Sequence, residues 1–113
     1  MIPATNFVGQ SGRAYSFAHA EDASLFPNTA GNFLYVRQDS EGRSVVFVGT
    51  SHDMLNGVRE RWPEAVGVYG ATSVFVRRIV SSRTRELEHE DLLERFRPVM
   101  NDETHAAPST RRA

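Results

Sequence analysis

The stretch from residue 31 to residue 49, GNFLYVRQDSEGRSVVFVG, decides the fold. Residues 32–38 and 43–49 are rich in the β-branched and aromatic side chains that are typical of strands. Residues 39–42, DSEG, lie between these runs and form a strong reverse-turn sequence. The stretch therefore predicts a β-hairpin of two paired strands.

An amphipathic helix is predicted directly after this hairpin. Met54, Leu55, Val58 and Trp62 recur at steps of three and four residues, and the hydroxyl side chains at positions 50 and 51 are suited to cap the first turn. We expect the helix to end near Pro63, with one short further helical turn over residues 64–70.

A further strand and a last helix complete the pattern. Residues 71–80, ATSVFVRRIV, predict a strand with Val74 and Val76 on one face and Phe75 on the other. Residues 83–96 are strongly helix-forming and end before Pro98. The predicted apolar stripe of this helix consists of Leu87, Leu92, Leu93 and Phe96.

The N-terminal part predicts an additional hairpin over residues 5–18, with residues 9–12, GQSG, as its turn. Residues 19–30 read as a connecting loop whose Leu25 and Phe26 pack on the core. Residues 102–113 show no apolar periodicity, so we expect a disordered tail there. The whole predicts an α+β fold: one domain over residues 1–101, with a small antiparallel sheet flanked by helices.

Composition limits the class of protein. The chain has 113 residues, a net charge of −1 and no cysteine, which excludes disulfides and thiolate zinc sites. We find no leader segment and no apolar run of membrane-spanning length, so we expect a cytoplasmic protein without a membrane partner. A near-neutral chain is not expected to bind DNA avidly without specificity, so any nucleic-acid site must be a local patch.

Four short motifs, in order, resemble the GIY-YIG endonuclease superfamily over about residues 30–101. Residues 31–33 (GNF) stand where that family has Gly-Ile-Tyr, and residues 47–49 (FVG) where it has Tyr-Ile-Gly. Residues 70–72 (GAT) precede a strand as they do in that family, and residues 91–101 (DLLERFRPVMN) look like its closing segment. The residues that keep the family pattern are Gly31, Gly49, Pro98 and Asn101.

The resemblance implies phosphodiester hydrolysis by two tyrosines, an arginine and a metal-binding glutamate. At the tyrosine positions this sequence has Phe33 and Phe47, which keep a ring but have no hydroxyl. Counting without a gap, the arginine position falls on Gly57 and the glutamate position on His89. The sequence therefore predicts a degenerate member without catalytic residues, cofactor or metal. Both phenylalanines are also suited to simple core packing.

Two alternatives remain open. In the first, a loop two residues longer makes Arg59 the catalytic arginine, and a register error of one residue makes Glu88 or Glu90 the metal ligand of an active nuclease. In the second, the domain binds only protein, including a second copy of itself, through an exposed strand edge or the acidic last helix. The remaining histidines are too scattered to indicate a zinc site.

The favoured hypothesis is a nucleic-acid-binding or regulatory module that uses the former active-site face. Arginine side chains suit backbone phosphates, and an aromatic ring can stack on an unpaired base. DNA and RNA fit equally well, and Trp62 also suits a core position. The predicted binding residues are Arg59, Arg61, Trp62, Arg77 and Arg78.

Overall fold

The hairpin predicted from residues 31–49 forms the centre of the computed structural model, which describes residues 4–20 and 28–101. Strand β3 (Gly31–Asp39) pairs antiparallel with strand β4 (Gly42–Ser51) across the predicted turn. The register shifts after Tyr35, because Val46 is an additional residue on β4 that forms a β-bulge. The strands are longer than predicted by one or two residues at their ends.

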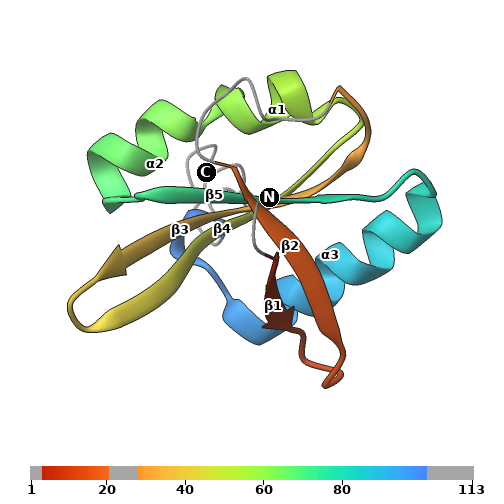
Figure 1. The fold of residues 1–113 in the computed structure, drawn as a ribbon, viewed down its shortest axis with the longest axis horizontal. Helices are drawn as coiled ribbons and strands as arrows, with labels where there is room; N and C mark the ends of the chain where they lie inside the picture. The colour runs from red at the N-terminus through yellow and green to blue at the C-terminus, as the bar shows by residue number, and fades with distance from the viewer. Residues whose placement is uncertain (1–3, 21–27, 102–113) are drawn as a thin grey trace, which may run out of the picture.

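Three more strands extend the hairpin into a five-stranded antiparallel sheet with the order β1-β2-β5-β3-β4 (Figure 1). The N-terminal hairpin consists of β1 (Ala4–Val8) and β2 (Ala14–Ala20), and β2 pairs with β5 (Ser73–Arg78). The hairpin predicted over residues 5–18 therefore forms and joins the main sheet. Residues 19 and 20, predicted as loop, belong to β2 because they pair with β5.

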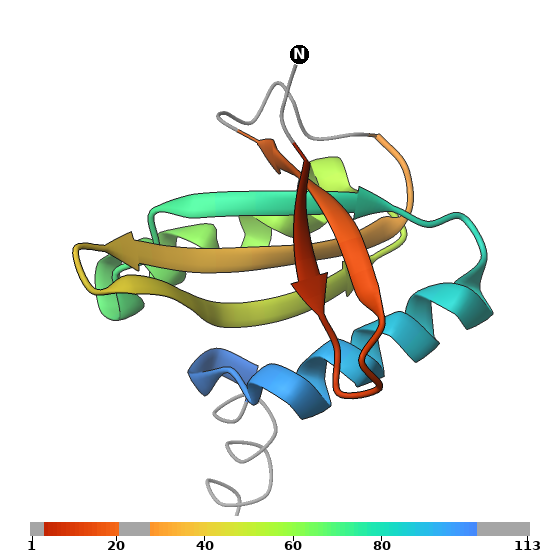
Figure 2. The ribbon, with the colours of Figure 1, turned by 60° about the horizontal axis from the view of Figure 1, so that its bottom comes forward.

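Helices cover both faces of the sheet (Figures 1 and 2). Helices α1 (Met54–Glu60) and α2 (Trp62–Tyr69) lie on one face, and α3 (Ser82–Phe96) lies on the other. Pro63 lies in the first turn of α2, where the backbone N–H that proline lacks has no helical partner in any case. The predicted short turn is thus a helix of eight residues.

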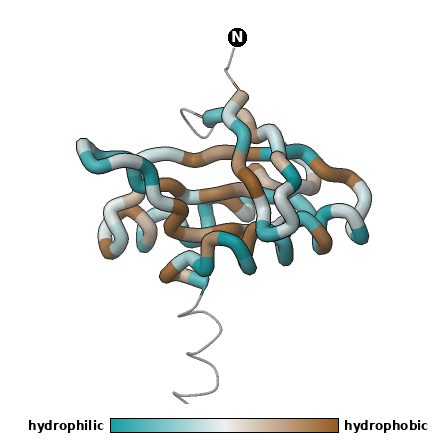
Figure 3. Tube along the Cα trace, turned by 90° about the horizontal axis from the view of Figure 1, so that it is seen from below, coloured by the Kyte–Doolittle hydropathy of each residue, from teal (hydrophilic) through white to brown (hydrophobic). Residues whose placement is uncertain are grey.

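Each face of the sheet has its own apolar core. Val74 and Val76 face α1 and α2, whereas Phe75 packs on the side of α3, which confirms the predicted alternation. Figure 3 shows hydrophobic residues along the strands in the middle of the molecule and hydrophilic residues at the turn between β3 and β4. The α+β class predicted from the sequence is confirmed.

The predicted apolar stripe of α3 is wrong at one position. Leu92 is fully buried, but Leu87 is 59% exposed, because five residues rotate a helix by roughly 140° from one side chain to the other. In this part of α3 the buried residue is Arg85. Its guanidinium donates to the carbonyls of Ile79 and Val80 at 3.1 and 3.2 Å. The carbonyl groups compensate part of the cost of burying this charge.

Several predictions concern residues outside the described ranges. The packing of Leu25 and Phe26 and the disordered tail over residues 102–113 belong to this group. Within residues 4–20 and 28–101, no helix combines the length and the apolar composition needed to cross a membrane.

Candidate functional site

Phe33, at the first predicted tyrosine position, is a buried core residue of β3. It pairs with Gly49 of β4, and its ring lies directly against that glycine. A Cβ atom added at Gly49 would collide with the Phe33 ring. Gly31, at the start of β3, is confined in the same way by the Arg77 carbonyl and the Met54 side chain. The glycines of both motifs therefore permit close packing of the sheet and α1.

Phe47, at the second predicted tyrosine position, is half-buried in an aromatic cluster with Phe33, Tyr35 and Trp62. Its ring centroid lies 5.2 Å from that of Tyr35 and 5.9 Å from that of Phe33. The Arg61 guanidinium lies over the outer side of the Phe47 ring, 5.3 Å from the centroid. This cation–π contact is the point at which the cluster meets the surface.

Tyr35 carries the hydroxyl closest to these positions, and the sequence analysis did not single it out. It lies two residues after Phe33 on the same strand, which places both rings on one face of the sheet. The side chain is fully buried, and the hydroxyl donates to the Val58 carbonyl of α1. Burial raises the pKa of Tyr35 far above its ordinary value of 10.0. This phenol is therefore held protonated and does not face the surface.

Gly57, at the predicted arginine position, packs against the end of β4. A Cβ atom there would collide with the Ser51 side chain. The Ser51 hydroxyl donates to the Asp53 carbonyl at 2.8 Å and accepts from the Asp53 N–H at 3.0 Å, so its position is fixed. Helix α1 therefore approaches β4 closely at Gly57, and a side chain at this position would collide with Ser51.

His89, at the predicted glutamate position, bonds to the backbone of β4. Its Nε2 atom lies 3.1 Å from the Val48 carbonyl oxygen. Because a carbonyl only accepts, Nε2 carries the proton in this contact. Asn101 bonds to the same residue: its Nδ2 donates to the Val48 carbonyl at 2.9 Å, and its Oδ1 accepts from the Val48 N–H at 2.8 Å. Both side chains hold the edge strand of the sheet.

Arg77 of β5 and Glu88 of α3 form an ion pair between the sheet and the helix. Two guanidinium nitrogens donate to the two carboxylate oxygens, at 2.7 and 3.2 Å, and the Glu88 side chain is only 13% exposed. The guanidinium also lies 5.6 Å from the ring centroid of Tyr15. The structure thus joins a predicted nucleic-acid-binding arginine to an alternative metal ligand, and both are engaged by each other.

The other predicted binding residues lie on the α1–α2 side or at the end of β5. Arg61 and Trp62 are neighbours at the junction of α1 and α2, and the Arg61 guanidinium donates twice to Glu64 Oε1, at 3.0 and 2.8 Å. Arg59 lies exposed on the preceding turn of α1. Arg78 lies exposed beside Gly31 at the end of β5. Arg77 faces the opposite side of the sheet, towards α3.

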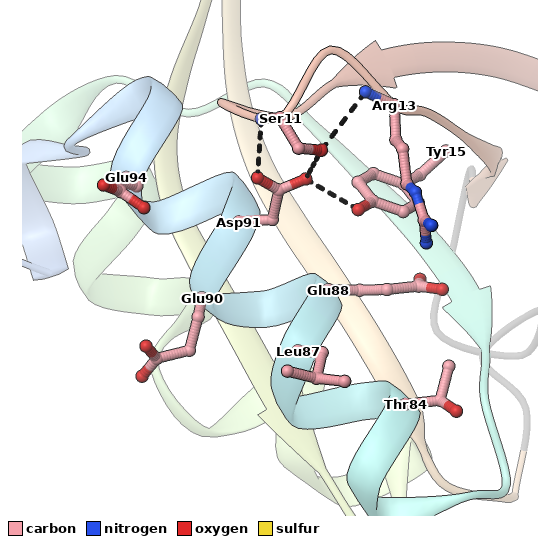
Figure 4. Close-up of a pocket in the computed structure, with 9 residues that line it drawn as sticks. All are labelled: Ser11, Arg13, Tyr15, Thr84, Leu87, Glu88, Glu90, Asp91 and Glu94. Atoms are coloured by element: carbon pink, nitrogen blue, oxygen red, sulfur yellow. Dashed lines mark hydrogen bonds between the residues drawn. The ribbon is translucent and has the colours of Figure 1, made fainter.

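A shallow pocket of about 510 Å³ lies between the β1–β2 hairpin and α3 (Figure 4). Asp91 closes its upper end: it accepts from the Ser11 N–H and hydroxyl at 2.8 and 2.7 Å, and from the Tyr15 hydroxyl at 2.6 Å. In Figure 4, Glu90 and Glu94 point away from this contact. Of the lining residues, Ser11, Tyr15 and Asp91 hold the hairpin to α3.

The hydrogen bonds of this clamp shift two pKa values in opposite directions. Partial burial favours the protonated form of Asp91, but the bonds from Tyr15 and Ser11 outweigh it and hold the pKa of Asp91 below its ordinary value of 3.8. Burial and the adjacent Asp91 carboxylate raise the pKa of Tyr15 above 10.0. Across the described ranges, no three His, Asp or Glu side chains are grouped so as to hold a metal ion.

Comparisons with protein-family models, curated proteins and solved structures give no match for this chain. The GIY-YIG resemblance therefore stays a prediction that rests on the four motifs and on the elements that carry them.

Proposed function

We propose that this chain is a catalytically inactive GIY-YIG-like domain that binds nucleic acid through its α1–α2 side. The proposal that the domain is catalytically inactive rests on the contacts of the residues at the four positions where the family has catalytic groups. Phe33 packs on Gly49, Phe47 lies under a guanidinium, Gly57 contacts Ser51 and His89 bonds to β4. The residues at these positions pack the fold, and none of them provides the hydroxyl, guanidinium or carboxylate that phosphodiester hydrolysis would use.

The arrangement of elements supports the GIY-YIG part of the proposal. The order hairpin, helix, strand and helix that the resemblance implies is present as β3–β4, α1, β5 and α3, with α2 between α1 and β5. The first two motifs lie at the start of β3 and near the end of β4, where they face each other across one ladder. Asn101, the last residue of the fourth motif, reaches back to β4 between Phe47 and Gly49. The first, second and fourth motifs are therefore neighbours in space as well as in order.

Nucleic acid is the ligand class that best fits the exposed groups on the α1–α2 side. We define the arginine–tryptophan surface as Phe47, Arg59, Arg61, Trp62 and Arg78. Arg59 and Arg78 are exposed, and neither is in an ion pair within the described residues. The Arg61 guanidinium is held over the Phe47 ring and paired with Glu64, so a phosphate or base that contacts it has to compete with that carboxylate.

The active-nuclease alternative receives less support from the same geometry. Glu88 would have to leave its ion pair with Arg77 to bind a metal. Glu90 is exposed on α3, across the sheet from Arg59 on α1. These alternative catalytic residues therefore lie on different faces of the sheet.

Fluorescence anisotropy with labelled single-stranded DNA, duplex DNA and single-stranded RNA tests the proposal. We expect affinity to fall as salt rises from about 50 to about 200 mM. The double variant Arg59→Gln and Arg78→Gln should bind more weakly and lower the salt slope by about 1 for each arginine removed.

Arg83→Gln is the matched control, because this exposed arginine begins α3 on the other face of the sheet. It should leave the affinity unchanged. Absence of salt-dependent binding by the wild-type protein, or an equal loss in Arg83→Gln, would overturn the proposed interface and favour a protein partner.

A further inference from the structure

A groove of about 370 Å³ with a mixed apolar and polar lining lies between the end of α2 and the segment that follows α3. Its floor is formed by β4 at the β-bulge, and its walls come from two segments about thirty residues apart in the sequence. We call it the valine groove. Its lining consists of Arg37, Ser44, Val45, Val46, Val68, Tyr69, Phe96, Arg97, Pro98 and Val99.

Two apolar side chains of the valine groove, Val68 and Val99, are strongly exposed. Val68 of α2 is 70% exposed and Val99 is 50% exposed, and both line the same groove. A single exposed valine is ordinary on a protein surface, but several apolar groups around one depression are typical of an interaction site. Partly buried Tyr69 and Phe96 provide further apolar area in the walls.

The charged residues of the lining are both arginines. Arg37 is about half exposed and has only a long contact of 3.7 Å with Asp39, and within the described residues Arg97 is in no ion pair. A groove with exposed apolar side chains and cationic groups in its lining is complementary to apolar side chains that are accompanied by carboxylates.

The backbone of Arg97 adopts an unusual conformation. It caps α3 in the left-handed conformation, with φ of 42° and ψ of 57°, and is the one non-glycine residue of positive φ in residues 4–20 and 28–101. Glycine or asparagine takes this position with less strain. This cap fixes the point at which the Arg97 side chain leaves the backbone beside the groove.

We propose that the valine groove docks an acidic amphipathic peptide segment of a protein partner. The apolar side chains of the segment would cover Val68 and Val99, and its carboxylates would bond to Arg37 and Arg97. This mode of recognition corresponds to an amphipathic helix laid in a hydrophobic groove. The surface shares no residue with the arginine–tryptophan surface, so this proposal stands or falls separately from nucleic-acid binding.

Selection from a phage library of random peptides on the order of 12 residues long, enough for about three helical turns, tests the proposal. The wild-type protein should enrich peptides in which apolar residues recur at helical spacing beside Asp or Glu. Val68→Asp should abolish the enrichment, and Val80→Asp should preserve it, since both valines are exposed and only Val68 lines the groove. Enrichment that is absent, basic in composition, or insensitive to Val68→Asp would overturn the proposal.

Binding of a selected peptide is then located by the methyl NMR signals of the valines. We expect shifts at Val45, Val46, Val68 and Val99, and unchanged signals at the exposed Val8 and Val80. Arg97→Gly should raise the thermal midpoint, because it relieves the left-handed strain, and at the same time weaken peptide binding by about fivefold or more. Uniform shifts across all valines, or unchanged affinity in Arg97→Gly, would contradict the proposed contacts.

Discussion

Asn101 bonds to both backbone groups of Val48: the Val48 N–H donates to Oδ1 at 2.8 Å, and Nδ2 donates to the Val48 carbonyl at 2.9 Å. Strand β4 is an edge of the sheet, so this side-chain amide bonds to it as a neighbouring strand would. The contact closes the edge of β4 at the position between Phe47 and Gly49. This contact gives the last residue of the fourth motif a structural role that does not depend on catalysis.

Asn101→Ala should lower the free energy of unfolding by about 1–3 kcal/mol, because it leaves two buried backbone groups with fewer partners. Urea unfolding measures this loss. Asn56→Ala is the matched control: this exposed amide bonds only the Asp53 carboxylate, so we expect a change below about 0.5 kcal/mol. Equal losses of unfolding free energy in the two variants would show that the contact with Val48 contributes no more to stability than an exposed side-chain bond.

Gly49→Ala should destabilise the protein by about 1–3 kcal/mol, because the added methyl group would collide with the Phe33 ring. Phe33→Leu should reduce this cost when the two changes are combined. Gly67→Ala is the control with the opposite sign: it has open space around it in α2, so removal of a helical glycine should stabilise by about 0.5–1 kcal/mol. A neutral Gly49→Ala variant would contradict the packing described for the two motifs.

The clamp between Asp91 and the β1–β2 turn should make stability depend on pH on the acid side. The pKa of Asp91 is lower in the folded protein than its ordinary 3.8, so its contribution is complete above pH 3.8 and is lost as the pH falls through the folded value. Asp91→Asn should be less stable at neutral pH and should lack this acid-side loss. The measurement is urea unfolding between roughly pH 2 and pH 7.

Two further variants separate this effect from general acid denaturation. Tyr15→Phe removes one bond to the carboxylate, so the acid-side loss should move up towards the ordinary pKa of 3.8. Glu94→Gln removes an exposed carboxylate on the same helix and should keep the wild-type profile. The same profile in wild type and Asp91→Asn would show that the clamp has no part in it.

The sheet and helices could be predicted where local pattern and packing agree. Residues 31–49 alternate and turn as a hairpin must, and the alternation of Val74, Phe75 and Val76 was read correctly because both faces of β5 are covered. The error at Leu87 arose because helix α3 buries Arg85 against backbone carbonyls, and a composition pattern does not show such a bond. The pairing of β2 with β5 depends on contacts between distant residues, which no local signal reveals.

The candidate site was only partly visible in the sequence. The positions of Phe33, Phe47, Gly57 and His89 followed from the motifs, and the structure shows each of them in packing or backbone contacts. The ion pair of Arg77 with Glu88 was not foreseen, because the two residues are eleven positions apart on different elements. The sequence pattern did not indicate the hydrogen bonds of Tyr35 with α1 or of Asp91 with the β1–β2 hairpin. The two-residue step from Phe33 could have indicated that Tyr35 lies on the same face of the sheet.

Incubation of supercoiled plasmid and labelled oligonucleotides with the protein and Mg²⁺ or Mn²⁺, with binding measured on the same samples, tests the central claim most directly. Arg59→Gln and Glu90→Gln are suitable variants, because both residues are exposed, whereas Glu88→Ala would also break the ion pair with Arg77. We predict salt-dependent binding without metal-dependent cleavage. Cleavage by the wild-type protein that is lost in Arg59→Gln or Glu90→Gln while these variants remain folded would contradict the account.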